Sequence, residues 1–192
     1  MSDKREEELF QTFRPFCSAL ATKPSMAILE KLQELVHRAQ DLQGLTEIQE
    51  YIIFPMQLYL KTPTMPENYT LAVFNFVAMF YSKVELRSKF VLKDMIENTL
   101  TLIMKLDKPS EDFKISFAKM LTSLFKSAKE FDIKKYVYEE DLKLPLSHII
   151  FQLLDWTENE EARIVIFASL ETIDALGKNM TLTSSFYTIC NC

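Results

Sequence analysis

Two histidines and a serine are the first candidates for chemistry in this 192-residue chain. His148 follows Ser147, but adjacent helical residues point about 100° apart, so the two side chains cannot form a nucleophile–base pair from one helix. His37 lies among polar neighbours on an expected helix and is interpreted as a surface or boundary side chain. The pattern therefore predicts no catalytic residue, no cofactor-binding residue and no metal ligand.

The three cysteines form neither a metal-binding pattern nor an even set for disulfides. Cys17 has an apolar position on the expected first helix, which favours a buried side chain over a reactive thiol. Cys190 and Cys192 lie at the end of the chain. This usage indicates a reducing compartment, the cytosol or the nucleus.

Charged clusters offer a weaker signal. The acidic run from Glu158 to Glu161 fits the first turn of a helix, where carboxylates complement the helix dipole. The basic cluster is interpreted as a solvated connection, with a docking patch for an acidic partner as the alternative. Its members are Lys126, Lys129, Lys134 and Lys135.

Composition narrows the class of protein. The formal net charge of −5 is opposite in sign to that of proteins that bind nucleic acid through phosphates. No apolar run reaches the roughly 18 residues that a membrane span needs. Two glycines in the whole chain favour helices over strands and tight hairpins. We therefore expect an all-α protein with no nucleic-acid or membrane partner.

Apolar residues recur at helical spacing, and prolines and polar residues interrupt them. Capping boxes at Thr46/Gln49 and Thr157/Glu160 and an N-cap at Ser110 predict helix starts. Residues 129–140 are expected to form a longer connection. Eight helices are expected over about residues 4–21, 26–42 (ended by Gly44), 46–63, 67–84, 86–106, 110–128, 144–156 and 157–177.

A proline phase repeats along the chain. Pro15, Pro55 and Pro145 are each followed by apolar residues at the first, fourth and fifth positions, and Met95 stands where a further proline would fall. A period of about 40–50 residues in a helical pattern is typical of HEAT and armadillo arrays. The sequence thus predicts a HEAT/armadillo-like α-solenoid of about four antiparallel helix pairs over residues 1–177. Residues 178–192 are expected to be an irregular or disordered tail.

Two helices carry specific expectations. Pro55 removes a backbone donor and crowds the carbonyl of Tyr51, so a bend is expected there. The last helix has an apolar set wider than one neighbour can cover, and this predicts a protein-contact surface at Ile166, Phe167 and Leu170. We expect self-association or a protein partner at this C-terminal end.

Between residues 9 and 63 the chain carries a motif with proline at two corresponding places. The first part is an Arg-Pro-x-Cys run containing Arg14, Pro15 and Cys17. The second is a Tyr-x-x-Phe-Pro run of Tyr51, Phe54 and Pro55. This motif resembles the start of Tel-two-interacting protein one, the family of large HEAT-repeat scaffolds of the Triple-T (TTT) complex. Phe13 and Met56 stand where that family usually has leucine.

The resemblance implies a function. The family's scaffold joins two partner solenoid proteins into an adaptor for the ninety-kilodalton heat-shock chaperone and the RuvB-like ATPase cochaperone. The clients are the phosphatidylinositol-kinase-related protein kinases, including TOR, ATM and ATR. No catalytic residue belongs to this scaffold, and its members are several times longer than this chain.

Two other functions remain open at this stage. One is a generic HEAT-type adaptor in transport or trafficking, which would bind transport GTPases or coat subunits. The other is an all-helical enzyme, which the sequence disfavours because it offers no metal cluster, phosphate loop or acid–base pair.

Overall fold

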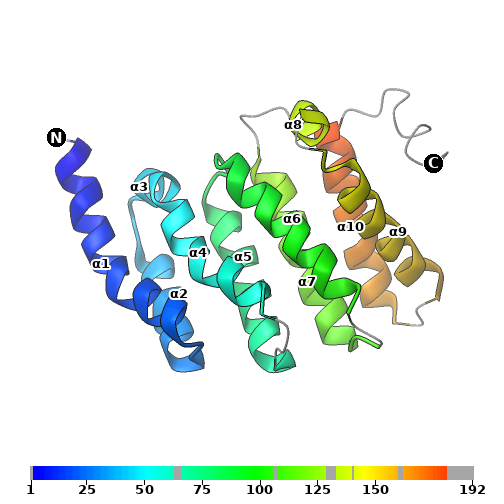
Figure 1. Ribbon diagram of the computed structural model, residues 1–192, viewed down its shortest axis with the longest axis horizontal. Coiled ribbons are helices and arrows are strands. Elements are labelled where there is room, and N and C mark those ends of the chain that lie inside the picture. Colours follow the sequence, from blue (N-terminus) through cyan, green and yellow to red (C-terminus); the bar gives the residue numbers. More distant parts are fainter. Residues whose placement is uncertain are drawn as a thin grey trace.

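The computed structural model describes residues 2–62, 66–105, 108–128, 133–139, 141–159 and 162–180. Within these ranges every regular element is an α-helix, and ten helices are present. The helices stack side by side along one direction, with α1 (Ser2–Thr22) and α10 (Arg163–Met180) at opposite ends (Figure 1). The predicted all-α solenoid is confirmed.

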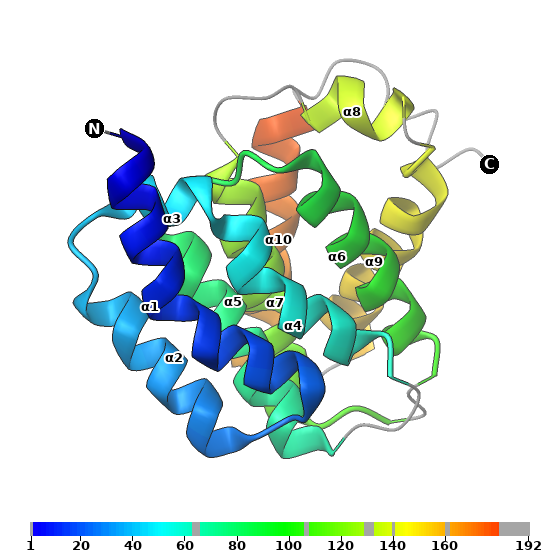
Figure 2. The ribbon, with the colours of Figure 1, turned by 60° about the vertical axis from the view of Figure 1, so that its left-hand side comes forward.

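The helices form two rows, one in front of the other in Figure 1. The outer row is α1 (Ser2–Thr22), α4 (Gln49–Leu60), α6 (Lys89–Ile103) and α9 (Lys143–Asn159). The inner row is α2 (Met26–Arg38), α5 (Glu67–Lys83), α7 (Glu111–Ser127) and α10 (Arg163–Met180). Figure 2 shows the two rows from the N-terminal end, with α1 and α2 in front. Each outer helix and the inner helix that follows it correspond to one expected pair.

An aromatic cluster joins the two rows near the middle of the stack. Phe117 on α7 is fully buried and meets Phe74 of α5 edge to face, with ring centroids 5.8 Å apart. The same ring meets Trp156 of α9 edge to face at 5.7 Å. Edge-to-face pairs suit the quadrupoles of aromatic rings and add to the stabilisation from burial. The apolar stripe of residues 110–128 therefore becomes a central part of the core.

Serine side chains begin two of the helices. The Ser110 hydroxyl accepts a hydrogen bond from the Phe113 N–H at 3.2 Å, which confirms the N-cap expected there. Ser88 does the same for Val91 at 3.1 Å at the start of α6. Each bond satisfies a backbone donor that the first helical turn leaves without a partner.

The expected end of the second helix is wrong. The helix ends at Arg38, and a separate short helix, α3 (Leu42–Glu47), contains Gly44. Asp41 explains the break, because its carboxylate accepts a hydrogen bond from the Gly44 N–H at 2.9 Å and so caps α3. A Cβ atom on Gly44 would lie 2.9 Å from Cδ2 of Leu9, so this glycine permits close packing against α1.

Both expected capping boxes are also wrong. Thr46 lies inside α3, where its hydroxyl donates to the Leu42 carbonyl at 2.9 Å. Thr157 lies inside α9, where its hydroxyl donates to the Leu153 carbonyl at 2.8 Å. A threonine hydroxyl inside a helix can donate its hydrogen bond to the carbonyl four residues earlier. The residue type alone therefore does not mark a helix start.

Further differences lie toward the C-terminus. The expected connection over residues 129–140 contains a short helix, α8 (Ile133–Glu139), and the Tyr136 hydroxyl donates to the Lys89 carbonyl at 2.8 Å. Helix α10 continues through Gly177 to Met180. The rest of the expected tail, residues 181–192, lies outside the described residues. Pro55 lies within α4, and the bend there stays a prediction.

Candidate protein-interaction surface

Tyr51 joins the two halves of the sequence motif. Its hydroxyl lies 3.2 Å from the Ser18 hydroxyl and donates to the Arg14 carbonyl at 3.5 Å, so α4 is linked to α1. Its ring lies 4.5 Å from that of Phe10, centroid to centroid. Within the motif, Tyr51 therefore holds the first two outer helices together.

The other motif residues divide between the core and the surface. Cys17 and Pro55 are buried, and burial raises the pKa of the Cys17 thiol to about 12. Arg14, Pro15 and Phe54 are exposed. The buried motif residues help to position the helices. The side chains of the exposed motif residues lie on the surface of the outer row.

Gln49 links α4 to the segment that connects α5 and α6. The sequence predicted only a capping role for this residue. Its side-chain N–H donates to the Thr46 carbonyl at 2.6 Å and more weakly to the Glu85 carbonyl at 3.4 Å. Its side-chain oxygen accepts from the Arg87 N–H at 3.2 Å. A polar residue at the start of an apolar helix was the signal that could have identified this buried contact.

Two neighbours extend the contact around Gln49. The Tyr81 hydroxyl donates to the Gln49 side-chain oxygen at 3.4 Å. Burial, together with the charge of Glu50, raises the pKa of Tyr81, so the phenol stays protonated as a donor. The Ser88 hydroxyl donates to the Glu50 carboxylate at 2.5 Å. This polar contact, together with the apolar residues around it, closes the seam between the second and third helix pairs.

The predicted contact surface lies on α10, the last described helix. The exposed fractions of Ile164, Phe167 and Leu170 are 66%, 70% and 45%. Ile166 is half-buried. The opposite side of α10 packs on α7, where the Thr172 hydroxyl lies 2.8 Å from that of Thr122. One face of α10 is therefore built into the core, and another presents apolar side chains at the surface.

A shallow groove lies between α6 and α9 on the outer row. Its volume is about 340 Å³. The apolar part of its lining includes Ile103, Met104 and the half-exposed Phe151. His148 lies at its edge, which places one of the two histidines at the surface.

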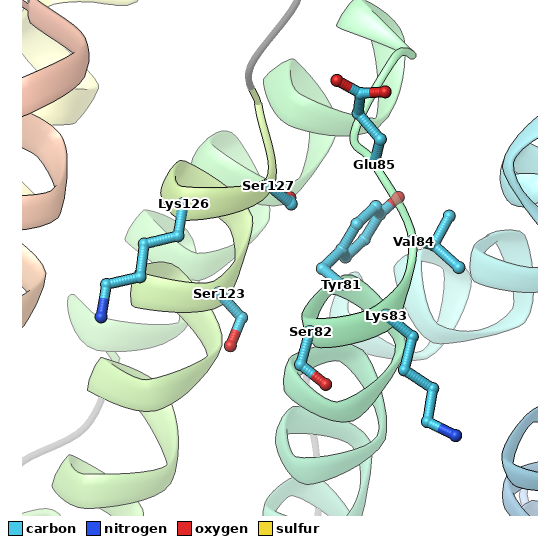
Figure 3. A pocket seen from close by; sticks show the side chains of 8 residues that line it. All are labelled: Tyr81, Ser82, Lys83, Val84, Glu85, Ser123, Lys126 and Ser127. Atoms are coloured by element: carbon cyan, nitrogen blue, oxygen red, sulfur yellow. The ribbon is translucent and has the colours of Figure 1, made fainter. Parts of the chain in front are cut away.

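A larger and more polar hollow of about 540 Å³ lies where α5 and α7 end (Figure 3). Its two lysines point away from each other in Figure 3. Lys83 donates to the His37 carbonyl at 3.2 Å, and Lys126 pairs with Glu171 at 2.6 Å. Since the two ammonium groups do not converge, the hollow is not built as an anion site.

The basic cluster is partly paired. Besides the Lys126–Glu171 ion pair, Lys135 lies 3.6 Å from Glu139 on the same helix. Lys129 and the side chain of Lys134 lie outside the described part of the chain. These exposed pairs fit the interpretation of a solvated connection.

The described residues form neither a metal site nor a membrane span. Among them, no group of three or more histidine, cysteine, aspartate or glutamate side chains could hold a metal ion. In the described ranges, no helix has the length and the apolar composition needed to cross a membrane.

The two rows of stacked helices define this chain as an α-solenoid of helix pairs. Proteins of this class bind partners along the extended surfaces that the stacked helices form. The chain matches the family model of the TTI1 N-terminal TPR domain over residues 10–187 and belongs to that family. The match extends the resemblance seen over residues 9–63 to nearly the whole chain.

Two curated relatives are similar to the chain. They are the proteins named TELO2-interacting protein 1 homolog from Mus musculus and from Homo sapiens, each 27% identical over 176 residues. The alignment covers 88% of this chain but only 16% of each relative. No solved structure matches the chain.

Proposed function

We propose that this chain is a non-catalytic scaffold segment of a Triple-T-type cochaperone complex. In this role it holds protein partners while phosphatidylinositol-kinase-related kinases such as TOR, ATM and ATR are assembled and stabilised. The observation that carries the proposal is the family match over residues 10–187. The two relatives are named TELO2-interacting protein 1 homolog, a name that describes them as interacting with TELO2.

The geometry supports a scaffold because the helix pairs are held in fixed positions by their seams. Tyr51 links α1 to α4, and Gln49 links α4 to the segment before α6. A stack held in this way presents its outer row as one continuous surface. Phe54 and Phe151, each 50% exposed, lie on that row and suit protein contacts better than catalysis.

The proposed partners are the other Triple-T subunits, the chaperone machinery and the kinase clients, and the proposed location is the cytosol with access to the nucleus. The motif resemblance and the cysteine usage support this location. Fluorescence microscopy of a tagged chain tests it, since signal confined to a secretory compartment would contradict it.

Affinity purification of the tagged chain followed by mass spectrometry tests the function. The expected result is recovery of Triple-T subunits and kinase clients, with equal recovery by a Phe167→Glu variant that lacks the largest exposed apolar side chain of α10. Recovery of transport GTPases or coat subunits instead would favour a generic trafficking adaptor. Loss of all partners in the Phe167→Glu variant would attribute their capture to the α10 face rather than to the outer row.

A further inference from the structure

The groove between α6 and α9 is an internal feature of the stack, and Figure 1 shows the two helices as neighbours in the outer row. Helix α8 holds their beginnings close together, because the Tyr136 hydroxyl donates to the Lys89 carbonyl at 2.8 Å. The Leu142 N–H donates to the Val137 carbonyl at 3.0 Å, which places the start of α9 beside α8. The two helices therefore start side by side and run in the same direction. Each repeat of a solenoid contacts only its neighbours, so the groove exists whether or not further repeats follow α10.

Exposed apolar side chains gather on the outer row. Helices α2, α5 and α7 of the inner row expose no large apolar side chain in the ranges that the structure describes. On α6 and α9 the exposed ones are Phe90, Met104, Leu144, Phe151 and Leu154. Met104, 72% exposed, and Phe151, 50% exposed, line the groove from the two helices, and Leu100 and Ile103 complete its apolar lining. The groove is thus a place where apolar side chains of two outer helices converge.

The two ends of the groove differ in charge. At the end where the helices begin, Lys89 is exposed, with its ammonium 5.4 Å from the centre of the Tyr136 ring, and His148 is the lining residue nearest to this end. At the end where the helices finish, Asp155 lines the groove and Glu158 follows one turn later, and both are exposed. The helix dipoles add to this difference, because N-terminal ends carry partial positive charge and C-terminal ends carry partial negative charge. The groove is therefore positive at one end and negative at the other.

Other charged groups near the groove do not remove this difference. Lys93 and Glu97 are four residues apart on α6, so their opposite charges offset each other. Asp141 and Lys143 are both exposed at the start of α9 and offset each other in the same way. Lys105 follows the end of α6 and, by helical position, projects away from the groove. The net difference in charge between the two ends is therefore retained.

We propose that the groove binds an amphipathic helix of a protein partner, antiparallel to α6 and α9, with basic residues in its first turn and acidic residues in its last turn. The proposal rests on the scaffold function proposed above. In this arrangement the basic N-terminal end of the partner lies over Asp155, Glu158 and the carbonyl ends of both helices, and its acidic C-terminal end lies beside Lys89. A parallel helix would bring like charges and like dipole ends together, which is unfavourable.

The side chains of the groove suit such a partner. Helix-in-groove recognition uses apolar residues of the bound helix at i, i+3, i+4 and i+7 spacing. Phe151 supplies a rigid aromatic anchor for them, and the flexible Met104 adapts to their shape. Gln152 and Asn159 donate to the Asp155 carboxylate at 3.2 and 2.7 Å. A carboxylate offers about four acceptor positions, so Asp155 can also accept a hydrogen bond from a basic side chain of the partner.

Fluorescence anisotropy with two designed, labelled peptides of about 16 residues, a little over four helical turns, tests the proposal. Both peptides carry leucines at i, i+3, i+4 and i+7 spacing in an alanine background. One has arginines in its first turn and glutamates in its last turn, and the other has these charges exchanged. The first peptide should bind the 192-residue chain about tenfold more tightly, although the second is the better helix former in isolation.

Variants of the chain locate the binding. Phe151→Glu should weaken the binding of the first peptide by about 100-fold or more, because it places a charge in the apolar part of the groove. Phe54→Glu is the matched control, since Phe54 is also 50% exposed but lies on α4, outside the groove, and its binding should equal that of the wild type. Asp155→Arg should remove the preference between the two peptides. Equal helicity by circular dichroism shows that the variants are folded.

Equal affinity for the two peptides would overturn the proposal, and so would an equal loss of binding in Phe54→Glu and Phe151→Glu. If neither peptide binds while the wild-type chain still recovers Triple-T subunits, the assignment of the groove is wrong and the scaffold function stands. If the first peptide binds as expected and no Triple-T subunit is recovered, the assignment of the groove stands and the scaffold function is wrong.

Discussion

The seam between α4 and α6 and the outward face of α10 are two helix surfaces with opposite designs. At the seam, buried Gln49 accepts a hydrogen bond from the Arg87 N–H, and Glu50 accepts one from the Ser88 hydroxyl. On α10, Phe167 and Ile164 are about two-thirds exposed. A polar contact has geometric requirements, so the seam accepts one partner in one position, whereas an apolar strip accepts any helix of suitable shape.

The two surfaces therefore have different roles. The seam stabilises the fold, whereas the face of α10 is a candidate for recognition. The buried polar groups at the seam are satisfied by neighbours from the same chain, which holds the second and third helix pairs in register. The outward side chains of α10 are exposed in the described part of the chain, so we expect them to contribute little to its stability. Substitutions at the two places should therefore have effects of different kinds.

The largest expected difference is between two phenylalanines on neighbouring helices. Phe117→Ala removes a ring buried among Phe74 and Trp156 and should lower the free energy of unfolding by about 3–5 kcal/mol. Phe167→Ala should change it by less than about 0.5 kcal/mol. Urea denaturation of both variants at a concentration that favours the monomer measures the two values. Similar losses in both would show that the α10 face belongs to the core.

The polar contact itself should give a smaller but clear effect. Gln49→Leu removes the acceptor used by the Arg87 N–H and the Tyr81 hydroxyl and should lower the free energy of unfolding by about 2–3 kcal/mol. Gln43→Leu is the matched control, because Gln43 is exposed and its side chain makes a long, 3.4 Å hydrogen bond to the exposed Glu47. Thermal unfolding compares the two variants, and an equal change would mean that apolar packing alone closes the seam.

Much of the fold was predictable because helical periodicity is a local property of the chain. The apolar stripe around Phe117 and the serine cap at Ser110 predicted α7 from its start to its end. The capping boxes failed at Thr46 and Thr157, because a threonine hydroxyl can bond within a helix as readily as at its start.

The surface was predictable only in part. The wide apolar set of the last helix placed Phe167 and Leu170 on a candidate surface, and both are exposed. Ile166 is half-buried, since its side chain lies toward the flank of that face. The distant partners of Gln49 are Tyr81, Glu85 and Arg87, and no local pattern connects positions so far apart in the chain.

The smallest expected effect concerns Cys17, which reports on the burial of α1. Burial raises the pKa of its thiol from an ordinary value near 9 to about 12. The unfolded chain therefore releases this proton at lower pH than the folded chain does. The contribution of the thiol to stability is complete below pH 9 and is lost between pH 9 and 12. At pH 10, one unit above the ordinary pKa, the loss should be no more than about 1.4 kcal/mol.

Urea denaturation of the wild type and of Cys17→Ala at several pH values isolates this dependence. The lysines, tyrosines and remaining cysteines are the same in both chains, so their contributions cancel in the difference between the two free energies of unfolding. Cys17→Ala should be the less stable chain at pH 8 and should approach the wild type as the pH rises above 9. Parallel curves would mean that water reaches the thiol in the folded chain, and α1 would then be a loosely held edge like the face of α10.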